Sequence, residues 1–204
     1  MSITENSFYT QFITAIELTS AVEWIAVIAG TIYVVLAALR HQLCWPAGII
    51  SSLFYIGINF KIGLNLDAVL QIYYCIIGGY GWWLWVKKKK ENESVSGIER
   101  MPQKRWIHLL AICLPLAFLL GFAQQKYTSS PAPFADAGLT VVSFAATWMT
   151  ARKYLENWLV WIAADFCYIF LYAQRGYALT SVLFLIYTFT ALAGYIAWRK
   201  QLKT

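Results

Sequence analysis

The sequence predicts an all-α integral membrane protein with seven membrane-spanning helices, arranged as three, one and three along the chain. Of its 204 residues, 60% are apolar and only 13% are charged, whereas average soluble domains carry roughly 25% charged residues. Apolar runs close to the ~20 residues that cross a bilayer recur along the whole chain. The region 22–87 also matches the region 136–200 at a constant offset of 113 residues. These observations argue against a soluble enzyme and against a nucleic-acid-binding protein.

The apolar runs define seven expected spans. In chain order they are Val22–Leu39, Trp45–Phe60, Leu66–Val86, Trp106–Phe122, Ala137–Ala151, Trp158–Ala173 and Ala178–Trp198. The second, fifth and sixth spans are short, and local thinning of the bilayer or flanking residues can accommodate them. The fourth span carries Pro115 and has no counterpart in the repeat.

The polar segments between the spans predict connections without membrane contact. Lys87–Arg105 is charged and poor in apolar residues, which is typical of a linker. Gln124–Asp136 contains two prolines, which disfavour a helix. The segment before Val22 carries Glu5 and Glu17 but no basic residue, so it lacks the positive region of a signal peptide.

The basic residues indicate the orientation. A cytoplasmic C-terminus places thirteen lysines and arginines inside and only Lys61, Lys126 and Arg175 outside. Membrane proteins show this bias because basic loops remain in the cytoplasm. We therefore expect an outside N-terminus. The net charge of +6 reflects this topology rather than an anionic partner.

The internal repeat divides a single membrane domain, residues 1–204. Repeat one is expected at 22–87, a linker with the fourth helix at 88–135, and repeat two at 136–200. Between Trp45–Trp85 and Trp158–Trp198, 11 of 41 positions are identical without a gap. Because each unit has three spans and the fourth span reverses the chain, the two units point the same way. Transporters use such parallel repeats and bind substrate between them.

One acidic residue lies in the middle of an apolar span. Asp165 shares a helical face with Trp158, Trp161 and Tyr168, at spacings of three and four residues. A carboxylate at this depth costs about 2.5–3.5 kcal/mol and marks a candidate functional site. It could serve as counter-charge for a cationic ligand, with the rings adding cation–π attraction. Alternatively, hydroxyls or an unwound backbone hold it as a structural carboxyl.

Polar and aromatic faces on three other spans complete the candidate binding site. Its further members are Trp45, Ser52, Tyr55, Asn59, Gln71, Tyr74, Thr180 and Tyr187. Gln71 could contact a ligand or join helices as a hydrogen-bonding residue. Trp45 and Trp158 stand at span ends, where many tryptophans form an interfacial belt. The four cysteines are isolated, and we expect neither a metal site, nor a cofactor, nor an enzymatic nucleophile–base pair.

Several segments resemble the PnuC family of bacterial nicotinamide riboside transporters. The run RKYLENWLVW, residues 152–161, is similar to that family's RKYxENWxxW signature. Leu70–Tyr74 and Tyr80–Trp85 resemble its LQxxY…YGWxxW segment. The resemblance extends from about Val22 to Lys200. Several members of the family carry asparagine where this chain has Asp165.

The resemblance implies a seven-helix fold related to the SWEET sugar transporters, and a homotrimer in the bacterial inner membrane. It implies facilitated diffusion of nicotinamide riboside without a coupling ion, with uptake driven by phosphorylation inside the cell. The ligand is then a cationic vitamin precursor. The lipid bilayer is the other expected partner, and we expect no nucleic-acid partner. Relatives in the same superfamily carry thiamine, which leaves the ligand open. A membrane receptor or scaffold that moves nothing is the alternative from a different class.

Overall fold

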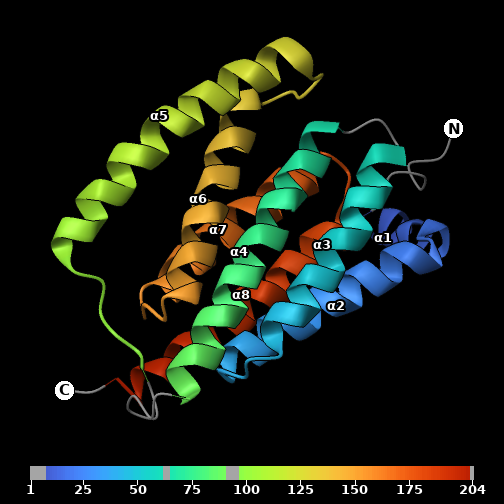
Figure 1. The fold of residues 1–204 in the computed structure, drawn as a ribbon. Coiled ribbons are helices and arrows are strands. Elements are labelled where there is room, and N and C mark those ends of the chain that lie inside the picture. The colour runs from blue at the N-terminus through green and yellow to red at the C-terminus, as the bar shows by residue number, and fades with distance from the viewer. Residues whose placement is uncertain (1–7, 62–64, 91–96, 203–204) are drawn as a thin grey trace, which may run out of the picture.

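The computed structural model describes residues 8–61, 65–90 and 97–202, and these residues form a bundle of helices (Figure 1). Within them, the helices are α1 Phe8–Leu18, α2 Ala21–Ala38, α3 Cys44–Lys61, α4 Asn65–Lys90, α5 Gln103–Tyr127, α6 Pro133–Ala151, α7 Asn157–Gln174 and α8 Ala178–Arg199. Helices α2 to α8 coincide with the seven expected spans. Helix α1 was not predicted, because at 11 residues it is too short for a search based on long apolar runs. It packs on α8.

The helix boundaries recur at the repeat offset. Helix α2 ends at Ala38 and α6 at Ala151, while α3 begins at Cys44 and α7 at Asn157. The ends of α3 and α7 and the starts of α4 and α8 are also 113 residues apart. Sequences that are mostly different therefore break their helices at the same places.

Equivalent turns explain part of this agreement. Arg40 and Lys153, which follow α2 and α6, both have a φ of 59°. In each turn the next N–H bonds back to a helix carbonyl, His41 N to Leu36 O at 2.8 Å and Tyr154 N to Met149 O at 3.0 Å. This left-handed ending satisfies carbonyls that a helix terminus leaves open, although glycine usually occupies the position. The use of non-glycine residues at both turns shows that the surroundings fix the conformation.

Six of the described helices, α2 to α4 and α6 to α8, pack as two groups of three. Helix α3 packs on α2 and α4, and α7 packs on α6 and α8. Two contacts join the groups, α2 with α8 and α4 with α6, and they are equivalent under the repeat. Helix α5 lies at the edge of the bundle, alongside α6 (Figure 1).

Four buried tryptophans form the centre of the core at one end of the bundle. This tryptophan quartet consists of Trp45, Trp85, Trp158 and Trp198. Two pairs have ring centroids 5.5 and 5.4 Å apart, both at 88°, and Trp85 meets Trp198 at 6.3 Å. The members are at most 3% exposed, so the interfacial-belt interpretation is wrong for Trp45 and Trp158.

The quartet also joins the two groups by hydrogen bonds. The indole N–H of Trp85 donates to Ala151 O at 3.0 Å, and that of Trp198 donates to Ala38 O at 3.1 Å. Each tryptophan therefore reaches from one group to the last residue of a helix in the other. The two bonds exchange under the 113-residue offset.

The expected linker Lys87–Arg105 is only partly a linker. Its first four lysines continue α4, while residues 91–96 lie outside the described part of the chain. Further on, Glu99 N donates to Lys153 O at 3.2 Å, and Leu155 N donates to Glu99 O at 2.9 Å. Ile98, at 4% exposed, is part of the core. Polar composition could not show this backbone pairing, because its partner is more than fifty residues away.

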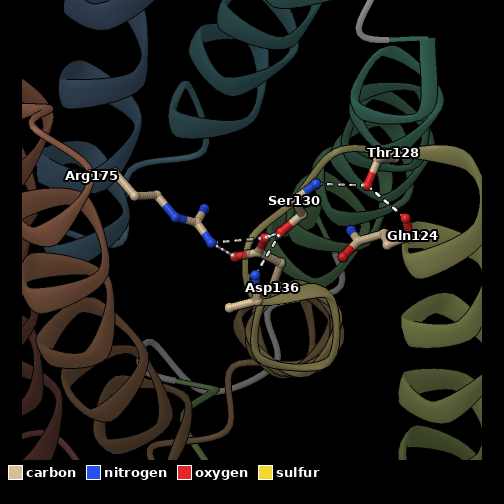
Figure 2. A network of polar contacts seen from close by, with 6 residues as sticks. Gln124, Thr128, Ser130, Asp136 and Arg175 are labelled. Carbon is tan, nitrogen blue, oxygen red and sulfur yellow. Dashed lines mark hydrogen bonds and ion pairs between the residues drawn. The ribbon is translucent and has the colours of Figure 1, made fainter.

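The expected loop Gln124–Asp136 is also shorter than predicted. Helix α5 continues to Tyr127 and α6 begins at Pro133, because proline fits the first turn of a helix, where its missing N–H has no partner to lose. Figure 2 shows the polar network there. Arg175, in the turn before α8, donates to Asp136 Oδ1 at 2.9 Å, and the Ser130 hydroxyl donates to Asp136 Oδ2.

Three of the described helices are long and apolar enough to cross a membrane. They are α2, α5 and α8. Among the other long helices, α3 carries Ser51 and Ser52 and α7 carries Asp165 inside their apolar runs. The count of seven spans and the orientation remain predictions from the sequence pattern.

Candidate functional site

Asp165 is buried in the middle of α7. Its side chain is 3% exposed and forms no ion pair with a described residue. Tyr168 lies one turn further along the same face of α7. Helix α7 therefore keeps its acid in the interior of the bundle, as expected for an ionisable group in a membrane protein.

Aromatic rings from α7 and α8 stack beside this acid. Tyr168 lies 4.6 Å from Phe184 with an interplanar angle of 24°, and Tyr172 lies 5.4 Å from the same ring at 8°. The Tyr168 hydroxyl is 3.3 Å from Ser143 Oγ on α6. Three helices thus fix the ring of Tyr168, and the stack forms a flat apolar wall with hydroxyl groups at its edge.

Three more of the predicted tyrosines belong to the same interior, Tyr187 on α8, Tyr55 on α3 and Tyr74 on α4. The hydroxyls of Tyr187 and Thr31 on α2 are 3.5 Å apart. The ring of Tyr187 lies 5.9 Å from that of Phe184. Tyr55 is half-buried on α3, and the ring of Tyr74 on α4 lies 5.5 Å from that of Phe144 on α6. We call the set Tyr55, Tyr74, Asp165, Tyr168 and Tyr187 the tyrosine–aspartate cluster. Both groups of helices contribute to it.

The remaining predicted residues are less closely associated. Ser52 is buried on α3 at 6% exposed. Asn59, Gln71 and Thr180 are half-buried on α3, α4 and α8, and no hydrogen bond between described residues joins them to the cluster. Trp161 is half-buried and packs against the core cluster that contains the tryptophan quartet, of which Trp45 and Trp158 are members.

Near the quartet, three buried polar atoms have no hydrogen-bond partner among the described residues. They are the Tyr33 hydroxyl and the indole nitrogens of Trp45 and Trp158. Buried polar groups in native proteins nearly always find a partner, so such exceptions need an explanation. Three unpaired groups close to an aromatic interior provide hydrogen-bonding capacity for a polar ligand.

Tyr33 was missed by the sequence reasoning. It lies on α2, its ring is 5.9 Å from Trp45, and a Cβ at Gly48 would be 3.0 Å from it. The available signal was a hydroxyl-bearing ring in the interior of a mostly aliphatic span. Its repeat counterpart is Ala146, so a comparison of the two halves does not mark Tyr33 as a polar position.

The signature segment 152–161 mainly supports the α6–α7 turn. Thr150 Oγ1 donates to Asn157 Oδ1 at 3.0 Å, and Asn157 Nδ2 donates to Tyr154 O at 2.6 Å. Glu156 Oε2 accepts from Met101 N at 2.9 Å. These side chains hold the start of α7, and therefore the height of Asp165 in the bundle.

A helical membrane protein with an interior of stacked rings around a carboxyl group has the features of a small-molecule carrier. Residues 20–200 match the family model described as Nicotinamide mononucleotide transporter. The chain belongs to this transporter family, which is not an enzyme family.

Relatives and a solved structure agree with this assignment. The chain is 27% identical over 203 residues to the nicotinamide riboside transporter PnuC of Escherichia coli, covering 88% of this chain and 85% of the relative. It is 25% identical over 175 residues to the riboflavin/roseoflavin transporter RibM of Streptomyces davaonensis, covering 84% and 81%. A crystal structure of the vitamin B3 transporter PnuC superposes with a TM-score of 0.70 at 21% identity, covering 95% of this chain and 87% of that one. It shares the fold.

Proposed function

We propose that this protein imports nicotinamide riboside by facilitated diffusion, without a coupling ion, and that phosphorylation inside the cell drives net uptake. Asp165 carries the proposal, because it is a buried carboxyl group beside stacked rings with no basic partner among the described residues. A pyridinium ring is flat and cationic, so it suits both the stack and the acid. The ribose hydroxyls suit the unpaired groups of Tyr33, Trp45 and Trp158.

The interior charge favours a nucleoside over a nucleotide. Helices α2 and α7 contain no lysine or arginine, and α3 and α8 carry one only at their ends. A phosphate group buried beside Asp165 would therefore meet a like charge and no counter-ion. The site supports the riboside as substrate, although the family description names the mononucleotide.

The proposal includes the arrangement in the membrane. Two parallel repeats, 22–87 and 136–200, flank the linker and α5, with seven spans in a SWEET-like order. The C-terminus lies in the cytoplasm of a bacterial inner membrane, and the functional unit is a homotrimer. The matching helix boundaries and the exchanged Trp85 and Trp198 bonds support the repeat.

Uptake into vesicles provides the test. Purified protein in vesicles without an ion gradient should take up labelled nicotinamide riboside in a saturable manner. An excess of unlabelled riboside should compete, whereas nicotinamide mononucleotide should not. Uptake equal to that of empty vesicles would reject the proposal. If thiamine or riboflavin binds and is taken up in place of the riboside, the protein is a carrier but its ligand is a different vitamin.

A further inference from the structure

An open groove runs along the edge of the bundle between α4, α5 and α6. Its volume is about 490 Å³. One wall lies on α5 from Arg105 to Leu116, and the other lies on α6 from Val141 to Arg152. At 1.5 Å per residue, each wall is about 16 Å long. Because α5 and α6 are antiparallel neighbours (Figure 1), both arginines lie at the same end.

Most of the groove is apolar. Apart from its basic end, its walls carry aliphatic and aromatic side chains and the thiol of Cys113. Ile112, at its outer lip, is 66% exposed. The length of about 16 Å is close to half of the ~30 Å hydrocarbon thickness, which is the depth of one leaflet.

The basic end of the groove contains a buried hydrogen-bond donor without a partner among the described residues. Arg152 Nε is buried and has no hydrogen-bond partner among the described residues, while its guanidinium lies 6.0 Å over the Trp148 ring. Arg105 donates to the Tyr154 hydroxyl and lies 5.5 Å over that ring, which holds it beside the groove. His108 is the third basic residue, and no acidic residue is among the described lining.

We propose that this groove binds an anionic phospholipid, with one acyl chain along α5 and the phosphate group at Arg105 and Arg152. Arginine pairs well with phosphate because its planar fork offers parallel donors. Basic pockets between membrane helices are suited to such head groups.

The test measures lipid retention by native mass spectrometry of the purified full-length protein. Phosphatidylglycerol and phosphatidylcholine with the same acyl chains are added at equal concentration. The native protein should retain phosphatidylglycerol at least fivefold more than phosphatidylcholine. The double variant Arg105→Gln/Arg152→Gln should lose this preference. Arg199→Gln, which removes an exposed arginine from the end of α8, should keep it.

A second variant addresses the acyl chain. Leu116→Trp fills the far end of the groove without changing any charge, and it should lower phosphatidylglycerol retention about threefold or more. Circular dichroism checks that each variant is folded, and Arg152→Gln alone serves if the double variant is not. Equal retention of the two lipids by the native protein would overturn the proposal. Unchanged retention of phosphatidylglycerol by Leu116→Trp would also overturn it. The same holds if the arginine variants change the oligomeric state but not the retention of phosphatidylglycerol.

Discussion

The two halves of the molecule agree at one end of the bundle and differ in the middle. At the quartet, Trp45 packs on Gly81 and Trp85 as Trp158 packs on Gly194 and Trp198. In the middle, Ser52 and Asp165 occupy equivalent positions, and Gln71 is the counterpart of Phe184. Agreement marks contacts on which the shared architecture depends. The differences lie where a ligand without symmetry would be bound.

Some differences compensate one another. In the first half the ring of Tyr33 lies against Gly48, whereas the equivalent positions in the second half hold Ala146 and Trp161. A large side chain comes from α2 in one half and from α7 in the other. Each half therefore has one large ring among these positions, and both rings pack against the core that contains the quartet. This exchange is how a repeated scaffold acquires an asymmetric interior.

The largest expected effect comes from removing the acid found in only one half. Asp165→Ala should lower the affinity for nicotinamide riboside about tenfold or more, which is ~1.4 kcal/mol, because the cationic ring loses its counter-charge. Asp165→Asn keeps a hydrogen-bonding oxygen and should fall between Ala and the native protein. Ser52→Ala, at the equivalent position, should change affinity less than about threefold. Binding to purified protein measures all three, and similar losses in Ser52→Ala and Asp165→Ala would contradict the asymmetry.

The next effect probes a contact that both halves share. A Cβ at Gly81 would lie 2.5 Å from the Trp45 ring, and one at Gly194 would lie 2.8 Å from the Trp158 ring. Alanine at either position should lower the free energy of unfolding by about 1–3 kcal/mol, because the buried rings cannot move away. The loss should be greater at Gly81. Thermal unfolding in detergent provides the measurement.

Gly79→Ala is the matched control, since nothing lies within 4 Å of a Cβ at that position. In a helix this change should be neutral or stabilise by roughly 0.5–1 kcal/mol. If Gly79→Ala destabilises as much as Gly81→Ala, the close packing on Trp45 is not the cause.

A smaller effect tests the exchanged hydrogen bonds. Trp85→Phe and Trp198→Phe each leave one buried carbonyl without its indole donor, which should cost about 1 kcal/mol or somewhat more. The two losses should agree closely because the bonds are equivalent, at 3.0 and 3.1 Å. Unfolding in mixed detergent micelles measures each change. A difference larger than about 1 kcal/mol between them would show that the halves are not equivalent at this end.

The smallest effect concerns an ion pair of the second half that has no equivalent among the described residues of the first. Asp136 pairs with Arg175 at 2.9 Å, whereas its counterpart Glu23 caps α2 by accepting from Ser20 N at 2.7 Å. The paired side chains are 17% and 22% exposed, so Asp136→Asn should cost about 1 kcal/mol or less. High salt should reduce this cost. Glu23→Gln should show a weaker dependence on salt, because it loses a local helix cap rather than an ion pair between distant residues.

The sequence by itself determined the class of protein, the positions of α2 to α8 and the burial of Asp165. Hydropathy, helical spacing and the 113-residue offset are local or periodic properties, so they can be read from the chain without coordinates. The same periodicity could not tell a packed ring from a ligand-binding one. For this reason Trp45 and Trp158 were placed in the site with no sign that they anchor the quartet, and Tyr33 was overlooked.

Only the tertiary structure decided which side chains meet. The bond from Trp85 to Ala151, the pairing of Glu99 with the α6–α7 turn and the stack of Tyr168 on Phe184 all depend on how helices approach in space. So does the groove beside α5, whose arginines lie 47 residues apart in the chain. The offset could show that two halves are alike, but a repeat carries no information on how its copies face each other. The contact between Trp85 and Trp198 and the indole bonds to Ala151 and Ala38 supplied that information.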